Sequence, residues 1–93
     1  MEDDWYMQEE ISVNFDTDGV KFILRKGDER KLFEISRIAL VDYFQTADTR
    51  ADALQNFEVN RDRILALALR ILIEKTDSDT YNIHLEDCRR FQL

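Results

Sequence analysis

The chain contains two glycines and no proline, and both glycines fall in turn dipeptides between runs of alternating apolar residues. Tight β-turns favour the pairs Asp18-Gly19 and Gly27-Asp28, because glycine adopts positive φ at no steric cost. On either side of these turns apolar and polar residues alternate, a period of two that is typical of half-buried strands. The alternating apolar positions include Ile11, Val13, Phe15, Val20, Phe22 and Leu24. The pattern therefore predicts an antiparallel three-strand meander over about residues 11–35.

Two helices and a last strand are predicted after the meander. Ser36 is placed to cap a first helix over about residues 37–45, whose apolar positions recur at helical spacing. Residues 49–52 resemble a capping box and open a second helix that the pattern carries over about residues 50–75. Residues 81–85 alternate again, which predicts a returning strand. The predicted fold class is α+β, with two layers and both helices on one face of the sheet.

Length and composition limit the chain to one small domain. It has 93 residues, of which 44% are hydrophobic and 35% charged, as in a compact folded domain and unlike a disordered tail. No stretch has the composition of an interdomain linker. We therefore expect a single α+β domain over residues 11–93, preceded by an acidic N-terminal extension over residues 1–10.

The start of the chain does not resemble a targeting segment. Residues 1–4 are acidic where a signal peptide is basic, and the longest nearly apolar run, residues 64–73, is about half a membrane span. The single cysteine allows no internal disulfide. We expect a soluble cytoplasmic protein with no membrane association.

Charge is unevenly distributed along the chain, whose formal net charge is −7. Residues 1–18 carry seven acids and no base, whereas residues 19–37 carry six bases and three acids. Net acidity disfavours nonspecific attraction to nucleic acid, although a local basic patch could still contact phosphates. The candidate nucleic-acid residues, which support an alternative function, are Lys21, Arg25, Arg30 and Lys31. The competing interpretation is a solvated sheet face whose cations deter edge-to-edge pairing.

Motifs that could carry chemistry each have a simpler structural explanation. Residues 14–19 match the first half of a calcium loop, but Arg25 stands where that loop requires a bidentate Glu. His84 and Cys88 are four residues apart, yet the alternation places His84 on a strand, which does not favour a convergent dyad. One His and one Cys are too few for a zinc site. We expect no catalytic residue, no metal and no cofactor, and predict that the protein is not an enzyme.

The second predicted helix is more apolar than a two-layer fold can cover. Residues 64–73 are apolar nearly all round, whereas a sheet covers only one side of a helix. The surplus positions, which we predict to anchor a homodimer interface, are Leu65, Leu69 and Leu72. The alternative is that the first helix and residues 5–7 cover the surplus within the chain. The main predicted function is a non-enzymatic protein-interaction module that self-associates through this helix.

Two motifs in the predicted helices share their spacing with a known family. Residues 35–44 read I-S-x-x-A-L-x-D-x-F, and residues 57–64 read F-x-x-N-R-x-x-I. The chain thus resembles, over about residues 11–85, the small bacterial family catalogued as domain of unknown function 1488. Phe33 and Leu65 depart from the pattern of that family. The resemblance implies a two-layer α+β fold and a bacterial cytoplasmic setting, and it implies no activity or catalytic residue.

Arg61 of the second motif lies at the margin of the apolar helix face and needs a partner or access to solvent. One interpretation is an anion-binding arginine. The other is that its aliphatic stem covers the core while its guanidinium pairs with an acid of the first helix or the preceding loop, where the resemblance makes Asp42 the nearest candidate. We favour the structural interpretation, because a lone arginine with no glycine-rich loop makes a weak anion site.

Overall fold

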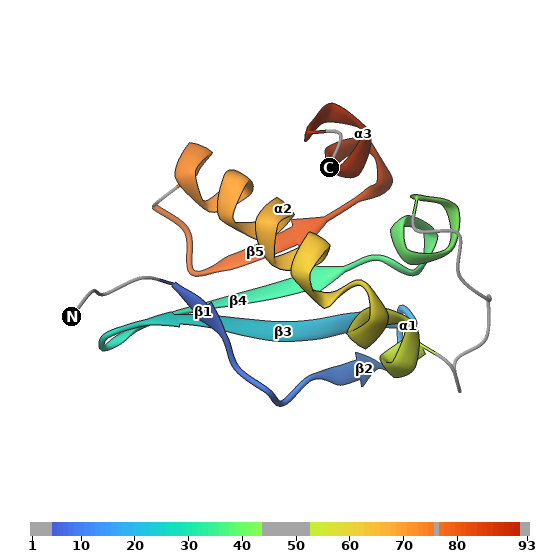
Figure 1. The fold of residues 1–93 in the computed structure, drawn as a ribbon, viewed down its shortest axis with the longest axis horizontal. Helices are drawn as coiled ribbons and strands as arrows, with labels where there is room; N and C mark the ends of the chain where they lie inside the picture. The colour runs from blue at the N-terminus through green and yellow to red at the C-terminus, as the bar shows by residue number, and fades with distance from the viewer. Residues whose placement is uncertain (1–4, 44–52, 76, 92–93) are drawn as a thin grey trace.

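The computed structural model describes residues 5–43, 53–75 and 77–91. In this part of the chain five strands form one sheet, and α1 and α2 cross one of its faces (Figure 1). The strands are β1 (Tyr6–Met7), β2 (Ser12–Asn14), β3 (Gly19–Lys26), β4 (Glu29–Ile35) and β5 (Thr80–Ile83). The helical elements are η1 (Ala39–Tyr43), α1 (Ala53–Val59), α2 (Arg61–Glu74) and α3 (Leu85–Phe91). The predicted α+β class is confirmed.

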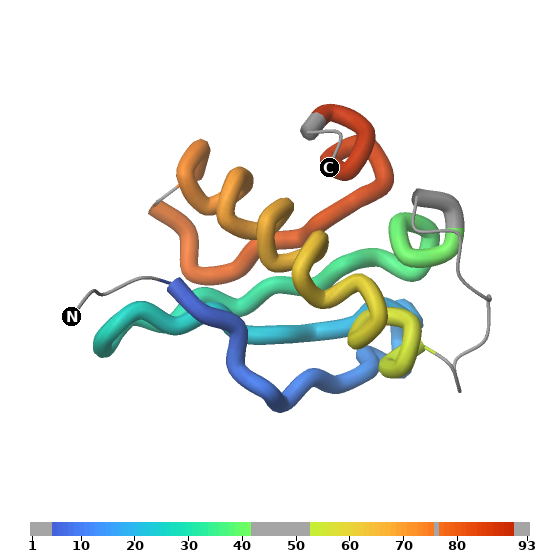
Figure 2. Tube along the Cα trace, viewed as in Figure 1, coloured from blue at the N-terminus to red at the C-terminus, as the bar shows by residue number. Residues whose placement is uncertain are grey.

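The sheet contains the predicted meander and the predicted returning strand. β2, β3 and β4 are antiparallel neighbours, with Phe22 of β3 directly opposite Phe33 of β4. β5 lies beside β4 and runs parallel to it, with Ile35 opposite Ile83. Parallel neighbours need a long crossover connection, and the helices η1, α1 and α2 lie within it (Figure 2).

The N-terminal segment also joins the sheet, which the sequence pattern did not predict. Tyr6 and Met7 of β1 pair with Arg25 and Leu24 of β3, so part of the predicted extension is a strand. Trp5 and Met7 are partly buried against the core. Trp5 and Met7 therefore cover part of the apolar surface, as the alternative interpretation of the helix surplus expected for this segment, whereas Tyr6 is exposed.

The single helix predicted over residues 50–75 is wrong, because its described part is divided into α1 and α2 at Asn60. In a continuous helix the Asn60 N–H would bond to the Asn56 carbonyl. Here the Asn60 side-chain amide donates to that carbonyl at 3.0 Å, and the backbone N–H donates to the Phe57 carbonyl at 3.1 Å instead. The side chain thus competes with the helical hydrogen bond and marks the break.

The first predicted helix begins where its cap placed it. The Ala39 N–H donates to the Ser36 hydroxyl at 3.1 Å, which is the predicted N-cap contact. From Ala39 the helix continues as the π-helical element η1. The end of the prediction, residues 44 and 45, lies outside the described residues.

The core lies between the helices and one face of the sheet. Phe22 stacks on Phe33 with ring centroids 5.3 Å apart, and Phe33 stacks on Tyr81 at 4.7 Å. Phe57 of α1 packs over Phe22 at 5.1 Å and joins the two layers. Burying each ring contributes roughly 1.5–3 kcal/mol to folding. None of the described helices combines the length and the apolar character that a membrane crossing requires.

Candidate interaction surfaces

The outward face of α2 keeps apolar side chains at the surface. Leu65 and Leu69 are only partly buried at the margin of the core, and Ile73 is 76% exposed. Leu72, the third predicted anchor, is 4% exposed and belongs to the core of the chain itself. Ile73 was missed by sequence reasoning, although it lies four residues from Leu69 and so on the same helical stripe.

A pocket of about 380 Å³ adjoins this face beside the C-terminal half of α2. Its apolar wall consists of Trp5, Leu69, Leu72 and Ile73, and the β3–β4 hairpin adds Lys26, Glu29 and Lys31. The Lys26 ammonium lies 5.9 Å from the centroid of the Trp5 ring, within cation–π range. The surplus apolar surface of α2 is therefore continuous with a hollow that the N-terminal segment helps to build.

Lys31 lies on the opposite face of the sheet from the other cations of the predicted nucleic-acid patch. It stands opposite Leu24 on the inner face and is 7% exposed. Its ammonium donates to the Ser78 carbonyl at 2.5 Å and lies 3.7 Å from a carboxylate oxygen of Asp79. Because its ammonium is held there, Lys31 stabilises the turn before β5 and does not contribute to a cationic patch on the outer face.

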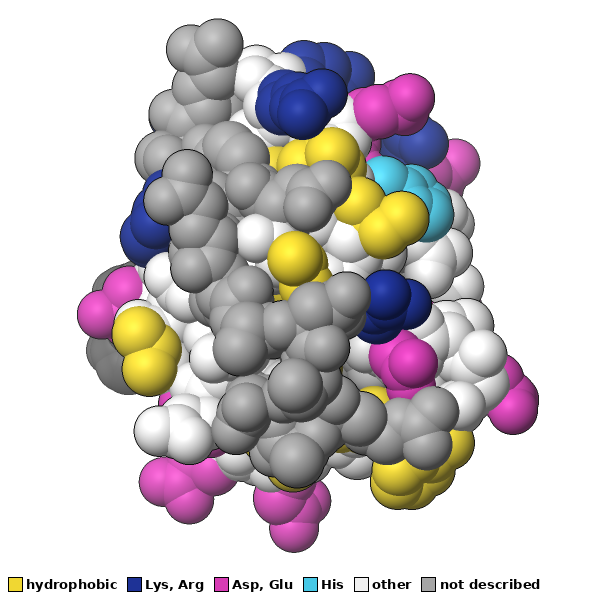
Figure 3. Space-filling model, turned by 90° about the vertical axis from the view of Figure 1, so that its right-hand side faces the viewer, with side chains coloured by type: hydrophobic (Ala, Val, Ile, Leu, Met, Phe, Trp, Pro, Cys, Tyr) yellow, Lys and Arg dark blue, Asp and Glu magenta, His cyan; other side chains and the backbone are white. Residues whose placement is uncertain are grey.

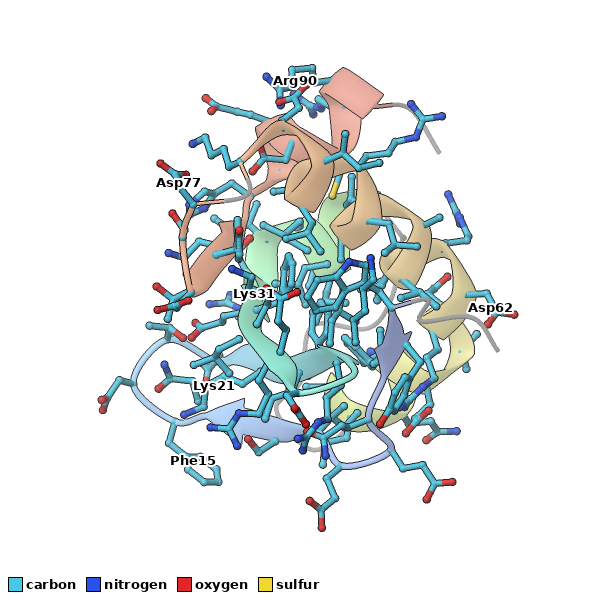
Figure 4. The ribbon with its side chains drawn as sticks, turned by 90° about the vertical axis from the view of Figure 1, so that its left-hand side faces the viewer. Phe15, Lys21, Lys31, Asp62, Asp77 and Arg90 are labelled. Atoms are coloured by element: carbon cyan, nitrogen blue, oxygen red, sulfur yellow. The ribbon has the colours of Figure 1, made fainter. Side chains whose placement is uncertain are left out.

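The other three predicted cations do share the outer face of the sheet. Arg25 lies between Tyr6 and Arg30 across the strands, and Lys21 lies opposite Glu34. Tyr6 is 55% exposed. Figure 4 shows Lys21 projecting from the side of the sheet that carries no helix among the described elements. The structure therefore places three cations and one aromatic ring on one face of the sheet, with Tyr6 directly beside Arg25, which the sequence alone did not indicate for Tyr6.

The loop that resembles a calcium site is held by hydrogen bonds between its own groups and Glu34. The Asp16 N–H donates to the Asn14 side-chain oxygen at 3.0 Å, which is the hydrogen bond of an Asx turn. The Asn14 amide and the Thr17 hydroxyl donate to the two Glu34 carboxylate oxygens at 3.1 and 2.7 Å. Within the described ranges, no three His, Cys, Asp or Glu residues are grouped to hold a metal ion.

His84 and Cys88 do not converge on a common site. Cys88 is fully buried, and burial, with a smaller contribution from the Asp87 carboxylate, raises the pKa of its thiol from 9.0 to about 11. His84 is exposed at the surface (Figure 3), and its backbone N–H donates to the Asp87 carboxylate at 2.9 Å. A thiol that stays protonated at neutral pH is a poor nucleophile.

Arg61 is engaged by groups of its own chain. Its guanidinium donates to the Glu58 carboxylate at 2.8 Å and to the Gln8 carbonyl, and it lies 6.0 Å from the centroid of the Phe57 ring. This geometry agrees with the structural interpretation of Arg61, but the predicted source of the acid is wrong: Glu58 belongs to α1, within the predicted second helix, and not to the first predicted helix or the preceding loop. The side chain of Asp42, the candidate partner, lies outside the described residues.

The similarity of this chain to known proteins extends over nearly the whole sheet and the helices between β4 and β5. A family model described as "Protein of unknown function (DUF1488)" matches residues 8–85, which leaves β1 and nearly all of α3 outside the match. No curated protein and no solved structure shows significant similarity to the chain. Because the match covers most of the chain and includes both helical motifs, the chain belongs to the family of proteins of unknown function DUF1488.

Proposed function

We propose that this chain is a non-enzymatic protein-interaction module that self-associates through α2. The observation that carries the proposal is the outward apolar stripe of α2, defined by Leu65, Leu69 and Ile73, which runs into the pocket beside Trp5. Contiguous apolar surface of this kind is costly to leave in water and is typical of interaction sites.

A dimer formed through this stripe should be of moderate affinity. α2 has 14 residues, so its length is about 21 Å. One helix face and an adjoining pocket bury less than the ~800 Å² per partner of a standard stable interface. We therefore expect monomers and dimers to exchange at micromolar concentrations.

The test is sedimentation equilibrium of the wild-type chain from about 1 to 500 μM, with Leu69→Asp as the probe. A buried aspartate at the centre of the stripe removes an apolar contact and adds a desolvation cost, so this variant is expected to stay monomeric. Leu32→Asp is the matched control, because Leu32 is 39% exposed on the other face of the sheet. Circular dichroism verifies that each variant is folded.

Two results would contradict the proposal. One is a wild-type chain that stays monomeric over the whole concentration range. The other is a dimer that Leu32→Asp dissociates and Leu69→Asp does not, which would move the interface to the outer face of the sheet.

Nucleic-acid binding is a second candidate function, favoured by the presence of Lys21, Arg25 and Arg30 on the same face of the sheet as the exposed Tyr6. Three phosphate contacts on duplex DNA predict a slope of about −2.7 for log K against log salt concentration. Arg30→Glu should abolish binding, whereas Lys75→Glu, away from the patch, should not. If DNA and RNA titrations at ~50 mM salt show nothing tighter than the non-specific range of about 10⁻⁴ to 10⁻⁶ M, the patch is a solvated sheet face.

A further inference from the structure

We infer that the free edge of β5 binds an extended, basic segment of another protein, which joins the sheet as an added strand. This inference concerns a surface separate from the apolar stripe of α2 and does not rest on self-association. β5 ends the strand order β1-β3-β4-β5, so in the described part of the chain it is paired on one side only, with β4. Strand addition to such an edge is a recurrent mode of peptide recognition, because main-chain groups supply the hydrogen bonds.

The hydrogen bonds between β4 and β5 fix which backbone groups of β5 face the free edge. Beyond the last pair of the ladder, the Ser36 N–H donates to the Ile83 carbonyl at 2.9 Å. Bonding residues alternate along a parallel ladder, so the N–H and C=O groups of Thr80 and Asn82 point away from β4. Among the residues that the structure describes, no hydrogen bond engages these four groups. An added strand can therefore pair with both residues.

A hollow of about 390 Å³ lies along this edge. Residues 80–82 and His84 form one side of it, and its other sides are the C-terminal end of α2 and the helix α3. α3 does not lie along the edge, because it turns away beyond the end of β5 and packs against η1 (Figure 1). Thr80 and Asn82 are exposed. The free backbone groups thus lie in a groove that is open to solvent.

The carboxylates around the groove favour a basic occupant. Residues 77–87, which include β5, contain four carboxylates and no Lys or Arg. Two of the four, Glu86 and Asp87, line the groove. Within the described ranges, the one carboxylate of this set that has a cationic partner is Asp79, which lies 3.7 Å from the Lys31 ammonium. The uncompensated negative charge attracts a cationic segment and disfavours an acidic one.

The cations near the groove do not cancel this charge. Arg90 lines the groove, but its guanidinium lies 2.6 Å from the Glu74 carboxylate, so the two form a neutral pair. Lys75 is the other base of the lining, and Arg89 does not belong to it. A second copy of the chain is a less favourable occupant, because its β5 would bring the same excess of carboxylates and its net charge is −7.

The test uses a fluorescently labelled octapeptide of alternating Lys and Val with blocked ends, titrated at ~50 mM salt beside its Glu/Val counterpart. We expect the Lys/Val peptide to bind about tenfold more tightly or better. Asn82→Pro removes an edge N–H and leaves the ladder with β4 intact, a change that edge strands tolerate, so it should weaken binding by about tenfold. Asn82→Thr is the matched control, because threonine keeps the N–H and favours strands.

Hydrogen exchange of the wild-type chain locates the bound peptide without any variant. The amides of Thr80 and Asn82 should exchange readily in the free chain and become protected by about tenfold or more when the Lys/Val peptide is added. The amides of Tyr81 and Ile83 already face β4, so their protection should hardly change.

Several results would overturn the inference. Peptide binding without protection of Thr80 and Asn82 would mean adsorption to the acidic surface. Equal binding of both peptides, a folded Asn82→Pro variant that binds as tightly as Asn82→Thr, or no binding tighter than about 1 mM would also exclude it. Protection of the two amides by raising the chain concentration alone would make a second copy the occupant. Leu69→Asp should leave peptide binding unchanged, so the proposed self-association and this inference can fail separately.

Discussion

Gly19 and Gly27 stand in turn dipeptides of the same kind, yet the structure requires glycine at each for a different reason. Gly27 adopts a φ of 60°, in the left-handed region that glycine tolerates. Gly19 has no such angle, and Asp18 before it takes a φ of 61°. A Cβ on Gly19 would lie 2.8 Å from the Ile35 carbonyl oxygen and 2.8 Å from a Glu34 carboxylate oxygen. The sequence pattern located both turns correctly but could not reveal this close cross-strand approach.

Substitutions at the two glycines should separate the two causes. Gly19→Ala is expected to lower the free energy of unfolding by about 1–3 kcal/mol through overpacking, because a backbone carbonyl cannot move aside. Gly27→Ala should cost about 1–2 kcal/mol through left-handed strain. Asparagine tolerates positive φ, so Gly27→Asn should recover part of the loss, whereas Gly19→Asn should not. Urea denaturation measures all four, and equal recovery at both positions would contradict this explanation.

Cys88 should make the stability of the chain depend on pH in alkaline solution. Burial raises the pKa of its thiol from 9.0 to about 11, so between these values the thiol ionises in the unfolded chain and stays neutral in the folded one. The stabilisation is present below pH 9 and is lost as the pH rises, at up to about 1.4 kcal/mol per pH unit. Urea titrations at pH 8 and pH 10.5 should show a smaller alkaline loss for Cys88→Ala. Equal losses in both proteins would exclude this origin.

At the scale of the elements, local patterns predicted the strands better than the helix boundaries. Alternation is a local signal, and it located β2, β3, β4 and β5. The break at Asn60 depends on a side chain that displaces a backbone hydrogen bond, which hydrophobic periodicity does not report. β1 has two residues and exists through its pairing with Arg25 and Leu24, so no local pattern marks it.

Arg61 of α2 contacts α1 and the segment that follows β1, so its removal should destabilise the packing of all three. Arg61→Ala loses the hydrogen bonds to Glu58 and Gln8 and the contact with Phe57, so we expect unfolding to become easier by about 1–3 kcal/mol. Self-association of the folded variant should persist. Arg70→Ala is the control, since Arg70 is exposed on the same helix. An unchanged melting temperature with lost binding of a phosphate or carboxylate ligand would instead make Arg61 an anion-binding residue.

At the scale of the whole molecule, the two faces have different chemical characters. The helical face presents an apolar stripe beside an apolar pocket, and the sheet face presents three cations and a tyrosine. Sequence reasoning found Leu65 and Leu69 of the first surface because the helix is too apolar to be fully covered. It could not assign Trp5 to the pocket or Lys31 to the core face, because both placements depend on how distant segments pack.

The helical surface predicts a concentration-dependent melting temperature. A folded chain binds its partner and an unfolded chain does not, so raising the concentration stabilises the fold by mass action, by at most roughly 1.4 kcal/mol per chain for a hundredfold increase. For a domain of this size, that limit corresponds to a rise of roughly 5–10 °C between ~5 and ~500 μM, and a chain only partly dimeric at ~5 μM shows a smaller rise. Leu32→Asp should keep the rise, and Leu69→Asp should abolish it. Calorimetry on the three proteins measures it, and a wild-type melting temperature that does not change with concentration would mean that α2 stays exposed to solvent in the folded chain.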